Sequence, residues 1–262
     1  MNRFRASLAV ALWFSAALWG QAPSYTAAGI VNACNQAQGP YAPNNVLSIM
    51  GKGLANSALG LTAADVAGGS LPTELNGVQV MVDGSAAPVF YVSPTQINFL
   101  MPPNKIAGPV TVWTTLNSYA GPQVSLTLQQ AAPALFPSTA DAGYAIAQQW
   151  PAYSTISPGS PVAPGGIVIL YATGLGPTAP APALPNEILT VAAPITQMAT
   201  FQVLLNGTPL TPEQVLYAGI CPGWAGLYQI DLVLPQNTGS SPAIQVAVGN
   251  QVSAPGLRLA VQ

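Results

Sequence analysis

The chain repeats itself, and the length of the repeat limits the folds that it can adopt. Three blocks of the first half recur in the same order in the second half, the first of them without gaps at an offset of 121 residues. The matching blocks are 42–54 with 163–175, 80–84 with 203–207, and 96–102 with 229–235. A period of this length predicts two similar domains and excludes a solenoid of short repeats.

Each half has the pattern of an all-β domain. Asp83-Gly84 and Asn206-Gly207 are dipeptides typical of tight hairpin turns, and apolar runs flank both of them. The expected strands are short and separated by turn residues, which favours two tandem immunoglobulin-like β-sandwich domains. We expect strands at 46–50, 77–82, 88–92, 96–101, 109–115, 123–128, 166–172, 200–205, 214–218, 227–234, 243–248 and 256–261.

The N-terminal segment has the composition of a secretory signal peptide. Arg3 and Arg5 supply a positive charge, and residues 6–19 form an apolar run of 14 residues. This run is shorter than the ~20 residues of a membrane-spanning helix, although a retained anchor is the alternative. Small residues at 20 and 22 stand where a signal peptidase cuts. We therefore expect export to the periplasm, the cell surface or the extracellular space.

The two halves need a connection, and proline marks it. Five prolines lie between residues 131 and 162, a spacing typical of an extended connector. Within it, residues 141–147 could add a short strand or hairpin. The expected division is a signal peptide at 1–22, a first domain at 23–135, a connector at 136–162 and a second domain at 163–262.

The composition excludes several classes of function. The chain has no histidine and two cysteines, so it has no histidine triad, histidine metal site or Cys₄ zinc site. Beyond residue 22 it has three basic residues, too few to neutralise a nucleic-acid backbone. No later apolar stretch is long enough to span a membrane. The acids are scattered, with Asp83 and Asp231 isolated from the others, so we expect no catalytic site, metal or cofactor.

Short motifs in both halves point in combination to one family. The motifs are 31–33, 42–43, 51–54, 71–78, 87–94, 96–99, 172–177, 217–219 and 226–230. Over residues 25–262 the chain resembles the secreted bacterial proteins that carry the Solibacter-type C-terminal domain, which is similar to IPT/TIG immunoglobulin-like modules. The resemblance implies an exported tandem of β-sandwiches, and it assigns no catalytic or binding residue.

Cys34 and Cys221 stand where the resembled family more usually has alanine. Export would place both in an oxidising compartment, where disulfides persist. We predict a disulfide between them across the domain junction, the alternative being two unrelated buried small residues. Because the closed loop would contain nearly the whole mature chain, the bond would stabilise the fold by ~4–5 kcal/mol, less any strain, on the chain-entropy argument.

Trp224 and Trp150 are the candidate ligand contacts. Trp224 lies in a loop rich in glycine and proline, and Trp150 precedes Pro151 in the connector. Exposed aromatic rings present flat faces to sugars or peptides. The alternative is that each ring covers the apolar end of a sandwich or packs between the domains.

These observations favour a non-catalytic secreted or cell-surface protein for adhesion, extracellular recognition or surface assembly. The alternative is a carbohydrate-binding module that uses the exposed tryptophans. The partner would be an extracellular protein or a polysaccharide. Because the surface carries few charges, self-association is a further expectation.

Overall fold

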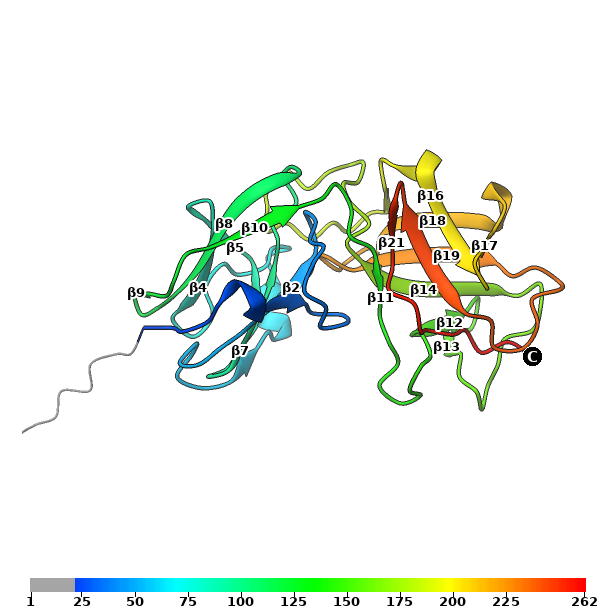
Figure 1. The fold of residues 1–262 in the computed structure, drawn as a ribbon, viewed down its shortest axis with the longest axis horizontal. Helices are drawn as coiled ribbons and strands as arrows, with labels where there is room; N and C mark the ends of the chain where they lie inside the picture. The colour runs from blue at the N-terminus through cyan, green and yellow to red at the C-terminus, as the bar shows by residue number, and fades with distance from the viewer. Residues whose placement is uncertain (1–21) are drawn as a thin grey trace, which may run out of the picture.

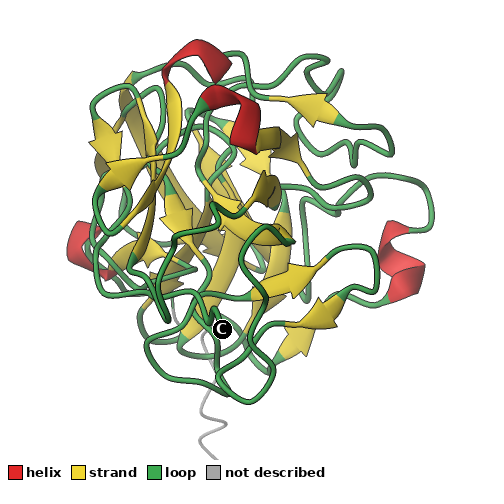
Figure 2. Ribbon diagram, turned by 90° about the vertical axis from the view of Figure 1, so that its right-hand side faces the viewer, coloured by secondary structure: helices red, strands yellow, loops and turns green. Residues whose placement is uncertain are grey.

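The computed structural model describes residues 22–262, so the expected signal peptide falls almost wholly outside the described part. Within it the regular structure consists of β-strands and short 3-10 helices, without an α-helix. Figure 1 shows two lobes side by side, one blue to green and one green to red, and Figure 2 shows the helices as short turns among the strands. No helix in this part is long and apolar enough to cross a membrane. The short helices are η1 (Ala27–Gly29), η2 (Ala63–Val66), η3 (Met198–Thr200) and η4 (Pro212–Gln214).

The first lobe is a sandwich of two antiparallel sheets. One sheet has the order β1-β2-β7-β6-β3, and the other has the order β10-β8-β4-β5 with β9 beside β8. Alternation along the strands builds the core between them, because Val78, Val80 and Val82 of β4 are fully buried. The strands are β1 (Ile30–Asn32), β2 (Val46–Met50), β3 (Leu59–Gly60), β4 (Val78–Val82), β5 (Ser85–Ala87), β6 (Val89–Val92), β7 (Gln96–Leu100), β8 (Gly108–Leu116), β9 (Tyr119–Ala120) and β10 (Val124–Leu128).

The second lobe is a sandwich of the same kind with its own core. A seven-stranded sheet has the order β13-β12-β14-β19-β18-β15 with β11 beside β14, and a four-stranded sheet has the order β17-β16-β20-β21. The fold class expected from the sequence, two tandem immunoglobulin-like β-sandwiches, is confirmed. The strands are β11 (Ala134–Leu135), β12 (Ala147–Gln149), β13 (Ser154–Thr155), β14 (Ile167–Thr173), β15 (Ala193–Pro194), β16 (Phe201–Leu205), β17 (Thr208–Pro209), β18 (Val215–Ile220), β19 (Tyr228–Val233), β20 (Ile244–Val248) and β21 (Gln251–Val252).

The segment expected as an extended connector carries part of the second sandwich. Residues 136–162 contain β12 and β13, and β12 pairs along the edge of β14. Figure 1 shows both strands beside β14 in the right-hand lobe. In contrast, residues 256–261 form isolated bridges in place of the expected strand, since Pro255 and Gly256 interrupt the backbone pairing. The exact domain boundaries stay predictions.

The sequence repeat corresponds to a structural repeat. In the first sandwich β2 pairs with β7, and in the second β14 pairs with β19. The registers agree as well, because Ser48 faces Asn98 in one pair and Ile169 faces Asp231 in the other. These are the positions that the repeated blocks match, so corresponding side chains of the two sandwiches can be compared directly.

Both predicted hairpin turns are present. Asp83 and Gly84 between β4 and β5 have φ values of 48° and 81°, and Asn206 and Gly207 between β16 and β17 have φ values of 51° and 79°. Positive φ at both central positions is typical of the type I′ turn, which matches the twist of hairpin strands.

Buried polar contacts join the two sandwiches. The Tyr228 hydroxyl is fully buried, donates a hydrogen bond to the carbonyl of Gly176, and accepts one from Asn44 Nδ2 at 2.9 Å. The backbone N–H of Val46 donates to Thr173 Oγ1 at 3.2 Å. A Cβ atom on Gly174 would overlap the carbonyl oxygen of Ala132 and the side-chain amide nitrogen of Asn45, and its φ of 75° also favours glycine. The halves therefore meet through specific hydrogen bonds.

Candidate functional site

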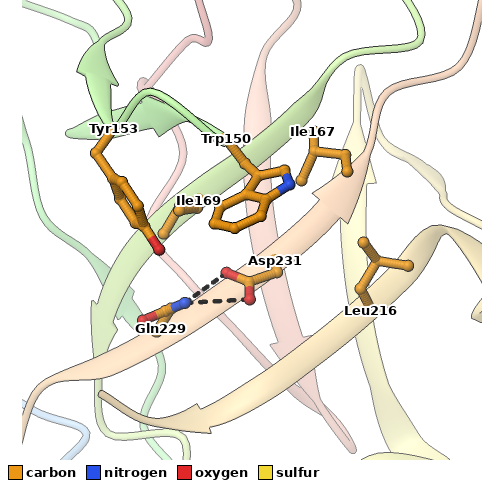
Figure 3. Close-up of a pocket in the computed structure, with 7 residues that line it drawn as sticks. All are labelled: Trp150, Tyr153, Ile167, Ile169, Leu216, Gln229 and Asp231. Atoms are coloured by element: carbon orange, nitrogen blue, oxygen red, sulfur yellow. Dashed lines mark hydrogen bonds between the residues drawn. The ribbon is translucent and has the colours of Figure 1, made fainter. Parts of the chain in front are cut away.

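A pocket opens on the outer face of the seven-stranded sheet. Its volume is about 230 Å³. Strands β14, β18 and β19 form its floor, and the loop between β12 and β13 covers one side (Figure 3). The lining residues are Trp150, Tyr153, Ile167, Ile169, Leu216, Gln229 and Asp231.

The β12–β13 loop supplies two aromatic rings. Trp150 is its first residue and Tyr153 its last, and their rings meet edge to face with centroids 5.6 Å apart and planes at 89°. Both rings remain accessible, with exposed fractions of 45% for Trp150 and 54% for Tyr153. Tyr153 has a φ of 53°, a conformation that bulky residues rarely adopt. The loop thus presents two perpendicular rings to the solvent.

Hydrogen bonds hold this loop against the sheet. Gln148 Nε2 donates to the carbonyl of Tyr153 at 3.0 Å, and the hydroxyl of Tyr171 on β14 donates to Gln148 Oε1 at 2.5 Å. Gln148 therefore links the end of the loop to the neighbouring strand, which fixes the position of the Tyr153 backbone.

The polar part of the floor comes from β19. Gln229 and Asp231 alternate with the buried core residues of this strand and therefore point to the outer face. Gln229 Nε2 donates to the two oxygens of Asp231 at 2.8 and 3.1 Å (Figure 3). Beside them Ile169 is only 2% exposed although it points outward, because the loop covers it. A carboxylate and an amide therefore lie below the aromatic rings on an apolar surface.

Burial changes the acid–base behaviour of this face. It raises the pKa of the Asp231 carboxyl, an effect that the hydrogen bond from Gln229 partly offsets. Burial likewise raises the pKa of the hydroxyls of Tyr171 and Tyr217, and the nearby Asp231 charge adds to the effect. The tyrosines therefore stay neutral near pH 7, and Asp231 is the one carboxyl among the residues that line the pocket.

The second predicted tryptophan lies elsewhere. Trp224 is 62% exposed in the loop after β18, beside a hollow of only about 10 Å³ that residues of both sandwiches line. The structure therefore does not bring Trp150 and Trp224 together. Both are exposed, so neither ring fills the end of a sandwich.

Another hollow at the junction is larger, at about 430 Å³. Its lining consists of Lys105, Ile106 and several proline, alanine, glutamine and threonine residues. Its lining residues include no aromatic side chain and no carboxylate.

The disulfide predicted between Cys34 and Cys221 is not formed, and both thiols are free. Cys34 Sγ donates to the carbonyl of Leu135 on β11 at 3.0 Å, whereas Cys221 follows Ile220 at the end of β18. Strands β14 and β19 stand between β11 and β18. Three strand spacings amount to ~14 Å, well beyond the ~7 Å limit between the Cα atoms of a disulfide.

Some of the site could be found in the sequence and some could not. Trp150 was a candidate, whereas Tyr153, Gln229 and Asp231 were not. The sequence signal for Gln229 and Asp231 is a repeated motif, which reads Gln96-Ile97-Asn98 in the first half and Gln229-Ile230-Asp231 in the second. Alternation along a strand places the polar residues of this motif on the outer face of a sheet. In residues 22–262 no group of three or more acidic or cysteine side chains could hold a metal ion. The absence of a cofactor stays a prediction.

Comparison with known proteins locates a family in the first half. Residues 30–129 match the IPT/TIG domain, which covers the first sandwich and confirms the IPT/TIG-like part of the expected resemblance. No curated protein matches the chain.

The solved structures that the chain matches include extracellular and surface proteins much longer than the chain itself. A plexin A4 extracellular region is 13% identical with a TM-score of 0.31, and the match covers 99% of this chain and 20% of that one. The surface glycan-binding protein SGBP-B of Bacteroides ovatus is 9% identical with a TM-score of 0.29, covering 85% of this chain and 43% of that one. PbSGBP-B of Prevotella bryantii is 9% identical with a TM-score of 0.26, covering 87% and 40%. The chain thus spans less than half the length of each of these proteins.

Proposed function

We propose that this chain is an exported, non-catalytic protein of extracellular recognition, and that the pocket on the second sandwich binds carbohydrate. One observation carries the proposal: two accessible aromatic rings stand beside an amide–carboxylate pair on an otherwise apolar floor. The motifs of both halves further support membership in the secreted family with the Solibacter-type C-terminal domain.

The chemistry of a sugar ring explains why this arrangement suits it. One face of a pyranose presents C–H groups, which pack on the flat face of an indole such as Trp150. Its rim carries hydroxyls that both donate and accept hydrogen bonds. Asp231 accepts hydrogen bonds, and the carbonyl oxygen of Gln229 accepts while its amide donates. A few fixed polar groups within an apolar pocket are the usual basis of specificity for small ligands.

The size of the pocket limits what it holds. Pockets for drug-sized ligands measure about 300–1,000 Å³. At about 230 Å³ this pocket has room for a single ring, while the rest of a chain would pass along the outer face. The proposal therefore favours recognition of one residue within a polysaccharide.

Trp150 and Trp224 provide a matched pair of test variants, since both are exposed and both lie in loops. Three forms of the chain from residue 23 are prepared: the unchanged chain, the Trp150→Ala variant and the Trp224→Ala variant. Each is mixed separately with insoluble polysaccharides and with cell-envelope fractions. We expect retention on a polysaccharide that Trp150→Ala abolishes and Trp224→Ala preserves.

Other outcomes would change the assignment. Retention that Trp224→Ala abolishes would place the ligand at the junction and refute the proposed pocket. Retention on envelope protein that neither substitution changes would favour assembly or adhesion through another surface. Circular dichroism of both variants verifies that each keeps the β fold.

A further inference from the structure

The two sandwiches differ at one pair of corresponding positions. In the first sandwich Ser48 faces Asn98, and in the second Ile169 faces Asp231. Gln96 and Gln229 occupy equivalent places two residues earlier on β7 and β19. The second sandwich therefore carries a negative charge where the first carries a neutral amide.

In the first sandwich, the side-chain oxygen of Asn98 finds its hydrogen-bond donors within the protein. Asn98 Oδ1 accepts hydrogen bonds from Ser48 Oγ at 2.7 Å and from Gln96 Nε2 at 2.8 Å. In the second sandwich the glutamine bond is kept, but the apolar Ile169 replaces the serine hydroxyl. The fold thus accommodates a neutral amide at this position, so the packing of the sandwich does not by itself require the negative charge of Asp231.

The charge is also unpaired. Within residues 22–262, the structure shows one ion pair, between Lys105 and Asp83 at 2.9 Å, so Asp231 has no basic side chain within reach. Arg258 donates to the backbone carbonyl of Ser241. A half-buried carboxylate without a cation is costly, and a bound cation would relieve that cost.

The aromatic rings strengthen the preference for a positive ligand. The faces of Trp and Tyr rings attract ammonium groups, and the attraction grows when the site is desolvated. The loop after β1 in the first sandwich has no such rings, since it begins with Ala33, Cys34, Asn35 and Gln36. Both sandwiches share a tyrosine on the next strand, because Tyr91 faces Asn98 as Tyr217 faces Asp231. The carboxylate and the rings therefore occur together in the second sandwich.

We propose that the sugar bound by this pocket is an amino sugar with a free, protonated amine, such as a glucosamine residue. The proposal rests on the carbohydrate-binding function proposed above. The ammonium donates hydrogen bonds to the Asp231 carboxylate, and the ring packs on Trp150. An acetylated amine carries no charge, and a uronic acid would be repelled by Asp231.

The test compares three probes of equal length by isothermal titration at pH 6. The probes are a hexamer of glucosamine, a hexamer of N-acetylglucosamine and hexalysine. We expect the glucosamine hexamer to bind at least about tenfold more tightly than the other two, which corresponds to about 1.4 kcal/mol. Asp231→Asn should remove the preference over the acetylated hexamer, and Trp150→Ala should remove binding of both sugars.

The control and the contrary outcomes separate the two proposals. Glu74→Gln removes an exposed carboxylate of the first sandwich and should leave the preference unchanged. Equal binding of both sugar hexamers that depends on Trp150 would refute the amino-sugar inference and keep carbohydrate binding. Hexalysine binding as tightly as glucosamine would refute the sugar as the ligand. A preference that survives Asp231→Asn, in a variant with the native circular dichroism spectrum, would also refute the inference.

Discussion

Replacing Tyr228 with phenylalanine removes one hydroxyl from the junction between the two sandwiches. This hydroxyl is fully buried, and it bonds to groups on two other segments, Gly176 and Asn44. The ring itself stays in the core, so no cavity larger than one oxygen forms. The substitution thus isolates the hydrogen bonds from the apolar packing.

The expected cost follows from the groups left behind. Without the hydroxyl, the Asn44 amide, which is 5% exposed, and the Gly176 carbonyl lose a partner. A buried polar group without a partner costs about 1–3 kcal/mol. Small movements of the two groups reduce the sum of their costs, so we expect a loss of about 2–3 kcal/mol in the free energy of unfolding. At roughly 2–4 °C per kcal/mol for a chain of this size, Tm falls by roughly 4–12 °C.

Differential scanning calorimetry and urea unfolding measure this loss. Tyr119→Phe is the matched control, because its ring is 48% exposed and its Tm should change by less than about 2 °C. If the Tm of Tyr228→Phe equals that of the wild type, the junction hydrogen bonds do not contribute to stability as expected. A combined Asn44→Gly and Tyr228→Phe variant should recover part of the loss, since the Asn44 amide is then no longer left unsatisfied and glycine adopts the φ of 64° at position 44 without strain.

Three further results are expected. Because burial raises the pKa of Asp231, its charged form destabilises the fold, so Asp231→Asn should raise Tm at pH 7; the gain should vanish below about pH 4, where the carboxyl is protonated in both states. Lys105→Ala breaks the exposed ion pair with Asp83 and should cost less than about 1 kcal/mol in urea unfolding; the pair holds the pKa of Asp83 low, so the cost should disappear as pH falls below about 4. Mass spectrometry after alkylation without reductant should find two modified cysteines per unfolded chain. In the native protein Cys221 should react before Cys34, whose thiol is buried with its pKa raised to about 12; an unreactive pair would indicate a disulfide.

Local features of the sequence predicted much of the fold. The hairpin at Asn206-Gly207 was predictable because positive φ at two residues in a row is a local requirement. The alternation of apolar and polar residues along β4 and β8 was also predictable from local sequence, since each strand turns one face toward the core. The repeat then predicted that the second half follows the first.

Features that depend on pairing between distant segments were harder to predict. The prolines around β12 suggested an extended connector, but the partner of β12 is β14, some twenty residues further along the chain. Nothing local to Asp231 showed that the loop with Trp150 and Tyr153 would cover it. The disulfide prediction failed because the number of strands between the two cysteines is a property of the sheet order.

The most direct measurement follows the indole N–H signals of the chain from residue 23 by nitrogen–proton correlation NMR. This chain has three tryptophans, Trp113, Trp150 and Trp224, and single Trp→Phe variants assign their signals. During titration with the glucosamine hexamer, the account predicts that the Trp150 signal shifts in a saturable way while the signals of Trp113 and Trp224 stay in place. A saturable shift of Trp224 with an unchanged Trp150, or no shift with this probe and with the polysaccharides used above, would contradict it.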